Sequence, residues 1–223
     1  MPYISRENNF SYLAVGLLLL LFLGGLLEYL PGDIGPRIVQ AGTVAIVFIS
    51  AWSARGVRSR LVANMIFVLV MGLMVAGGAL LDMAGFDYMH LLLLLCFFLW
   101  MTWLVAKQVL FTGSITSNDI VGAICIYMLL GLIWAILYLF IAQAVPESFN
   151  GLSQASWQEN FSAGVYFSFV TITTLGYGDI SPILPLARSL VVMEAIVGVF
   201  YMAILVASLI GVRMSDRAAA KKQ

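Results

Sequence analysis

The stretch Thr171-Ile172-Thr173-Thr174-Leu175-Gly176-Tyr177-Gly178-Asp179 lies between two long apolar segments, and the rest of the chain is organised around it. It is too polar and too rich in glycine to be a lipid-facing span. Backbone at membrane depth must be hydrogen-bonded, so irregular chain is tolerated there only inside protein or along a watery path. The glycines on either side of Tyr177 permit positive φ angles. The stretch therefore predicts successive carbonyl oxygens aimed at one axis, which no regular helix or strand provides.

The composition is that of a membrane protein. Hydrophobic residues make up 62% of the chain and charged residues 10%, whereas a soluble domain is close to half apolar and a quarter charged. The formal net charge is zero, which gives no reason to expect a nucleic-acid partner. The sequence contains no catalytic constellation and no nucleotide motif, so we do not expect an enzyme.

Apolar runs long enough to cross hydrocarbon predict six membrane-spanning helices. They cover residues 10–30, 38–54, 61–81, 90–111, 120–142 and 185–212. The polar segment 143–158 follows the fifth run, and Ser156 with Glu159 fits a capping box. A short re-entrant helix is therefore expected from near Ser156 to about Thr173. The predicted fold class is an all-α membrane protein with six spans and this re-entrant segment between the fifth and the sixth.

The basic residues predict the orientation, because Lys and Arg concentrate in cytoplasmic loops. With both termini inside, nine basic residues face the cytoplasm and two face outward. The inner set is Arg6, Arg55, Arg58, Arg60, Lys107, Arg213, Arg217, Lys221 and Lys222; the outer pair is Arg37 and Arg188. This topology also places the stretch around Gly176 toward the outer side.

The central stretch resembles the selectivity filter of the potassium channel superfamily, with Leu175 in place of the usual valine. The resemblance extends from about Ile120 to Val212: Tyr166 to Thr174 reads like the pore helix, and Asp179 to Pro182 like the outer mouth. It implies a bacterial-type six-helix channel with one filter segment per chain, selective for potassium. The first half resembles the peripheral domain of such channels only in layout.

The resemblance divides the chain into four parts. A four-helix peripheral domain that resembles a voltage sensor covers residues 1–111, and a linker covers 112–119. The pore domain covers 120–212, and a short cytoplasmic tail covers 213–223.

The resemblance also assigns site residues. The filter would bind K⁺ through the carbonyls of Thr174, Leu175, Gly176 and Tyr177, with the Thr174 hydroxyl adding an inner ring of oxygens. The expected supports of the filter are Thr173, Gly178, Asp179, Tyr166 and Phe167. Apart from bound K⁺ ions, no cofactor and no small-molecule substrate is expected.

A single filter segment cannot encircle an ion, so the resemblance implies a homotetramer. The remaining partner is membrane lipid. The expected location is the plasma membrane, as a multi-pass protein with both termini in the cytoplasm and most consistent with a bacterial inner membrane.

Two residues of the last span stand out. Glu194 is an ionisable residue at membrane depth, where charge is expensive and a functional role is the default reading. It is expected to support the filter from behind rather than to contact ions, with Arg188 as a poorly spaced candidate partner. Gly198 is either a gating hinge or a point of close helix packing, and the sequence leaves both open.

The fourth predicted helix contains only Lys107 and lacks the repeated arginines of a voltage sensor. Strong voltage gating is therefore not expected. His90, at the outer end of this helix, is expected to be a solvated interfacial residue. The alternatives to a potassium-selective channel are a weakly selective cation channel and a membrane subunit of a potassium uptake transporter.

Overall fold

The computed structural model describes residues 9–27, 34–53, 58–81, 85–110 and 117–220, and these form seven helices and one pair of short strands. The elements are α1 (Asn9–Leu27), α2 (Ile34–Ser53), α3 (Arg58–Leu81), α4 (Gly85–Leu110), α5 (Ser117–Ala144), β1 (Phe149–Asn150), α6 (Phe161–Ile172), β2 (Ser181–Pro182) and α7 (Pro185–Ala220). The protein is therefore all-α apart from β1 and β2, which pair antiparallel.

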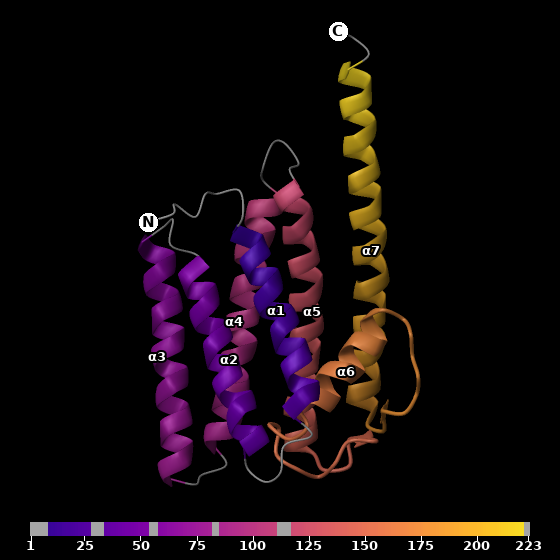
Figure 1. Cartoon of the computed structure of the whole chain (residues 1–223). Coiled ribbons are helices and arrows are strands. Elements are labelled where there is room, and N and C mark those ends of the chain that lie inside the picture. Colours follow the sequence, from indigo (N-terminus) through magenta and orange to yellow (C-terminus); the bar gives the residue numbers. More distant parts are fainter. Residues whose placement is uncertain (1–8, 28–33, 54–57, 82–84, 111–116, 221–223) are drawn as a thin grey trace.

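Helices α1 to α5 run alternately up and down in one bundle, and α1 and α4 both pack against α5 (Figure 1). The short α6 lies across the end of the bundle between α5 and α7. Helix α7 extends beyond the other helices toward the end at which α1 begins. We call α1 to α4 the peripheral group and α5 to α7 the pore group, after the predicted division of the chain.

Within the described residues, three helices are long and apolar enough to cross a membrane. They are Gly85–Val109 in α4, Asn118–Ala144 in α5 and Pro185–Leu205 in α7. The shorter apolar stretches Phe10–Phe22 and Asn64–Gly78 lie in α1 and α3. Three of the six predicted spans are supported in this way, and the other three stay predictions.

Several helix bounds differ from those predicted. Helix α2 begins at Ile34, four residues before the predicted span, because proline is tolerated in the first turn of a helix, where its missing N–H would have no partner. Helix α4 begins at Gly85 and has Asp87 in its first turn, where a carboxylate complements the helix dipole. Helix α7 continues to Ala220, so most of the predicted tail is helical.

The re-entrant helix is shorter than predicted. Ser156 and Glu159 do bond to each other, but in the turn that precedes the helix, and α6 begins at Phe161. Some of the predictions fall outside the described residues. They concern Arg6, Arg55, Lys221, Lys222 and the Thr112–Thr116 part of the linker.

A cluster of aromatic rings fixes α6 in the pore group. Tyr138 of α5 packs against Phe167 of α6 with ring centroids 5.1 Å apart, and Phe149 of β1 packs against Phe167 at 5.7 Å. All three side chains are at most 5% exposed. Because closely packed interiors resist displacement, this cluster holds the short helix in one position relative to α5 and β1.

Candidate functional site: the segment between α6 and α7

The backbone between α6 and α7 has an unusual sequence of dihedral angles. The φ angles of Thr174, Gly176 and Gly178 are 62°, 59° and 81°, whereas Leu175 and Tyr177 are not among the residues with positive φ. A backbone that alternates between left- and right-handed residues gathers its N–H groups on one side of the chain. The expected direction of the carbonyl oxygens is then the other side, as a row of cation ligands requires.

Thr174 is the residue of this segment that the glycine pattern did not identify. A positive φ at a β-branched residue is an outlier that costs on the order of 1–3 kcal/mol, and such strain clusters at functional sites. The residue type alone does not predict this angle, because Thr173 has an ordinary φ of −84°. Only the resemblance to the filter motif distinguished the two threonines.

The segment is tied to the end of α6 by backbone hydrogen bonds. The carbonyl of Val170 accepts from the N–H groups of Leu175 and Gly176, at 2.9 and 3.1 Å. The carbonyl of Ile172 accepts from the hydroxyl of Tyr127 in α5 at 3.0 Å. The C-terminus of α6, which carries partial negative charge, thus adjoins the residues that follow it and is held by α5.

Asp179 closes the segment at its other end. The hydroxyl of Tyr166 in α6 donates to Asp179 Oδ2 at 2.6 Å, and the N–H of Ile180 donates to Oδ1 at 3.0 Å. The bond from Tyr166 is the main reason why the pKa of the Asp179 carboxyl lies below its ordinary value. Together with the bonds at Val170, this bond connects both ends of the segment to one helix.

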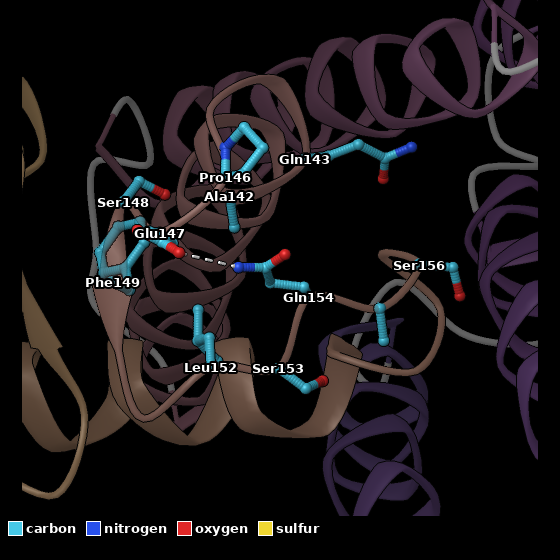
Figure 2. A pocket seen from close by; sticks show the side chains of 11 residues that line it. Ala142, Gln143, Pro146, Glu147, Ser148, Phe149, Leu152, Ser153, Gln154 and Ser156 are labelled. Atoms are coloured by element: carbon cyan, nitrogen blue, oxygen red, sulfur yellow. Dashed lines mark hydrogen bonds between the residues drawn. The ribbon is translucent and has the colours of Figure 1, made fainter.

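The loop that precedes α6 also touches Asp179. Gly151 has a φ of 84°, and a Cβ at this position would strike the Asp179 carbonyl oxygen. The same loop lines a pocket of about 230 Å³, in which Gln154 Nε2 donates to Glu147 Oε1 at 3.3 Å (Figure 2). The pocket is lined only by residues 142–156, so the Thr171–Asp179 segment lies outside it.

Glu194 of α7 is fully buried, and it contacts two hydroxyl groups. Tyr138 of α5 donates to its Oε2, and Ser168 of α6 lies 2.5 Å from its Oε1. Arg188, the partner considered from the sequence, instead donates from Nε to the Pro182 carbonyl at 3.2 Å. Glu194 therefore links three helices behind the segment and has no contact with Arg188.

At Gly198, α7 packs closely against the C-terminal end of α6. A Cβ at this position would strike the carbonyl oxygen of Ile172 and would lie 2.8 Å from Ile172 Cγ1. Helix α7 is continuous through this position. In this structure the missing side chain serves close packing, whereas the hinge remains a prediction.

The N-terminal end of α4 bonds to the segment that leads into α6. Asp87 Oδ1 accepts from Trp157 Nε1 at 3.1 Å and from Gln158 Nε2 at 2.8 Å. His90 stacks on the Trp157 ring with centroids 5.0 Å apart. The prediction that His90 is solvated was wrong: its side chain is 1% exposed, because Trp157 and Thr43 of α2 cover it.

The comparisons with known proteins identify the second half of the chain. Residues 122–214 match the family model described as "Ion channel", and the match covers most of α5, all of α6 and most of α7. This segment is an ion channel domain. The protein is accordingly a membrane protein and not an enzyme. No curated protein and no solved structure matched the chain.

Sequence reasoning missed several residues of the channel domain. Tyr127, Tyr138, Ser168 and Gly151 each touch the segment or its supports, from positions far away in the chain. For the three hydroxyl residues the sequence did offer one signal: each lies in an apolar helix, and a buried hydroxyl needs a hydrogen-bond partner. The sequence offered Glu194 no well-spaced partner within its own helix, and the hydroxyls of Tyr138 and Ser168 supply one.

Proposed function

We propose that the protein is a potassium-selective channel, in which four identical chains surround one pore and K⁺ crosses passively. The observation that carries the proposal is the alternation of φ from Thr174 to Gly178, in a segment whose sequence ends in Gly-Tyr-Gly-Asp. In potassium filters, carbonyls of such loops replace the hydration shell of the ion. Here the carbonyls of Thr174, Leu175, Gly176 and Tyr177 bind K⁺, and the Thr174 hydroxyl adds the innermost oxygens.

The exposure of the pore group supports assembly with further copies. In the single chain Leu175 is 56% exposed and Tyr177 is 68% exposed. Only 11% of the span in α7 is buried, against 67% of the span in α5. One chain supplies one side of an ion cage, so four copies related by rotation complete it. The mass of the protein in mild detergent should correspond to four chains; a dimer as the largest species in native lipid would contradict this arrangement.

The supports of the filter in this proposal come from the contacts described above. Tyr166 holds Asp179 by a hydrogen bond, and Phe167 packs against Tyr138. Thr173 donates from its hydroxyl to the Phe169 carbonyl at 2.6 Å and ends α6. Gly178 supplies the last positive φ, and Glu194 connects α7 to α6.

Opening of the channel is proposed to depend little on voltage. Helix α4 contains one lysine and no arginine, and the Lys107 ammonium lies over the Trp103 ring, 4.7 Å from its centroid. One elementary charge that crosses the whole field contributes about 2.3 kcal/mol per 100 mV, so steep gating needs several charges per subunit. A steep sigmoidal conductance–voltage curve would contradict the proposal on gating.

The proposed location is a bacterial plasma membrane, with both termini in the cytoplasm.

Liposomes test the transport activity directly. Purified protein in potassium-loaded liposomes should release K⁺ once a protonophore balances charge, whereas sodium-loaded liposomes should release little Na⁺. Equal release of both ions would favour a weakly selective cation channel. No release without a second subunit would favour a membrane subunit of an uptake transporter.

A further inference from the structure

The contacts around Glu194 restrict where the protons lie. Ser168 Oγ is 2.5 Å from Glu194 Oε1 and 2.6 Å from the carbonyl oxygen of Gly131 in α5. Tyr138 bonds to the other carboxyl oxygen, Oε2. Ser168, Tyr138 and Glu194 are all completely buried, so water does not reach these contacts from outside.

Three close oxygen pairs therefore need three protons. A serine hydroxyl has one proton, and a carbonyl oxygen can only accept. Because the Gly131 carbonyl has no proton, the Ser168 hydroxyl must donate to it. The proton between Ser168 and Glu194 must then come from Glu194. The Tyr138 hydroxyl supplies the third proton to Oε2.

An ionised carboxylate would leave this network one proton short. Either Ser168 and the Gly131 carbonyl or Ser168 and Glu194 would then face each other with lone pairs at hydrogen-bonding distance, which is repulsive. A buried carboxylate also needs a cation or several donors. Within the described residues the two hydroxyls are the polar contacts of Glu194, and Arg188 bonds elsewhere.

We propose that Glu194 is a neutral carboxylic acid that donates its proton to Ser168, and that this bond positions the pore helix α6 between α5 and α7. The chain of bonds runs from Tyr138 through Glu194 and Ser168 to the Gly131 carbonyl. It begins and ends on α5 and passes through α7 and α6. The acid is thus a positioning residue, which joins three helices and adds no charge behind the filter. This inference does not depend on which ion the channel carries.

The two tyrosines near Glu194, Tyr127 and Tyr138, do not exchange protons with its carboxyl group. The hydroxyl of Tyr127 already donates to the Ile172 carbonyl at 3.0 Å. Tyr138 has its own proton engaged at Oε2. Neither residue is a base, so nothing in the described part of the chain is placed to remove the proton from Glu194.

Infrared spectroscopy of the assembled channel tests the protonation directly. The parent protein is labelled with ¹³C-carboxyl glutamate and measured at neutral pH in lipid. A protonated-carboxyl C=O band should be present and should shift with the isotope label, and raising the pH moderately should not remove it. Glu194→Gln should abolish this band, whereas Glu159→Gln, at an exposed glutamate, should leave it. Absence of a label-sensitive protonated band in the parent would overturn the proposal without any variant.

Function of the variants provides a second, independent readout. Glutamine offers an N–H donor toward Ser168 and an oxygen for Tyr138, as a neutral acid does. Glu194→Gln should therefore keep conductance within about twofold of the parent. Glu194→Ala should lower it at least tenfold or prevent assembly, since it removes both bonds. If Glu194→Gln is as defective as Glu194→Ala while the parent lacks the infrared band, Glu194 is a buried carboxylate and the proposal is wrong.

Discussion

Asp87 and Glu194 both bond to the part of the chain that contains the pore helix, but they come from different halves of the molecule. Asp87 belongs to the peripheral group, is partly exposed and accepts from two N–H donors, Trp157 and Gln158. Both donors bring their own protons, so Asp87 acts only as an acceptor. Glu194 belongs to the pore group, is fully buried, and must provide a proton itself to Ser168.

The difference shows how the surroundings of an acid determine its chemistry. At the N-terminal end of α4, Asp87 remains partly accessible and accepts hydrogen bonds from the loop that precedes α6. Deep between α5, α6 and α7, a charge would need compensation that the surrounding hydroxyls do not provide. We therefore expect the contact of Asp87 to stabilise the folded position of α6, and the contacts of Glu194 to determine the geometry of the proposed filter. The following predictions separate these two contributions.

Replacing Gly178 with alanine should have the largest effect. Its φ of 81° is unfavourable for a residue with a Cβ, at roughly 1–2 kcal/mol per copy, and four copies share one filter. Selective conduction should be lost while the protein still assembles. Gly72→Ala is the matched control, because no atom lies within 4 Å of a Cβ at that helical position. Unchanged potassium selectivity in Gly178→Ala would show that this segment is not the filter.

Replacing Gly198 with alanine should be the next most damaging change. The new Cβ would strike the Ile172 carbonyl, and overpacking of this kind costs about 1–3 kcal/mol. The tetramer should melt at lower temperature and conduct less. Gly211→Ala in the same helix has open space and should be neutral or slightly stabilising. A Gly198→Ala variant that keeps its melting temperature but rarely opens would favour the hinge over close packing.

Removal of the contact between Asp87 and the loop before α6 should affect stability more than selectivity. Asp87→Ala leaves the N–H groups of Trp157 and Gln158 without their acceptor, which costs about 1–3 kcal/mol. The thermal unfolding midpoint in detergent should fall, with the ratio of potassium to sodium permeability unchanged. Glu159→Gln, at an exposed acid of the same loop, is the control. A changed permeability ratio in Asp87→Ala would show that the peripheral group also shapes the filter.

The smallest expected effect is a shift in acid sensitivity. The Tyr166 hydroxyl keeps the pKa of Asp179 below its ordinary value, so this bond stabilises the folded filter at neutral pH. The stabilisation is lost as the pH falls through the lowered pKa. In Tyr166→Phe the pKa should return toward the ordinary value, and inhibition by external acid should begin at higher pH. An unchanged midpoint of acid inhibition would show that Asp179 does not govern the filter mouth.

The sequence predicted the backbone conformation at Gly176 and Gly178 well, because that signal is local, whereas the filter itself stays a proposal. Glycine at 176 and 178 indicates positive φ from the residue type alone, and both angles are positive. The buried position of Glu194 behind this segment was also expected. These features follow from one stretch of chain and from the cost of charge at membrane depth.

The contacts that complete the site are not local, and the sequence did not reveal them. Ser168 and Tyr138 lie 26 and 56 residues away from Glu194, so their pairing depends on how three helices pack. The burial of His90 likewise depends on a loop some seventy positions further along the chain, which contains Trp157. Helix bounds also shifted where proline or acidic residues suit a first turn, as in α2 and α4.

The reversal potential of single channels in a planar bilayer tests the central proposal most directly. With unequal potassium and equal sodium on the two sides, current through a potassium-selective pore reverses at the potassium equilibrium potential. That potential should move by about 59 mV for each tenfold change in the potassium gradient, and Gly178→Ala should abolish the dependence. A reversal potential that stays near zero when sodium replaces potassium on one side would contradict a filter formed by the carbonyls of Thr174 to Tyr177.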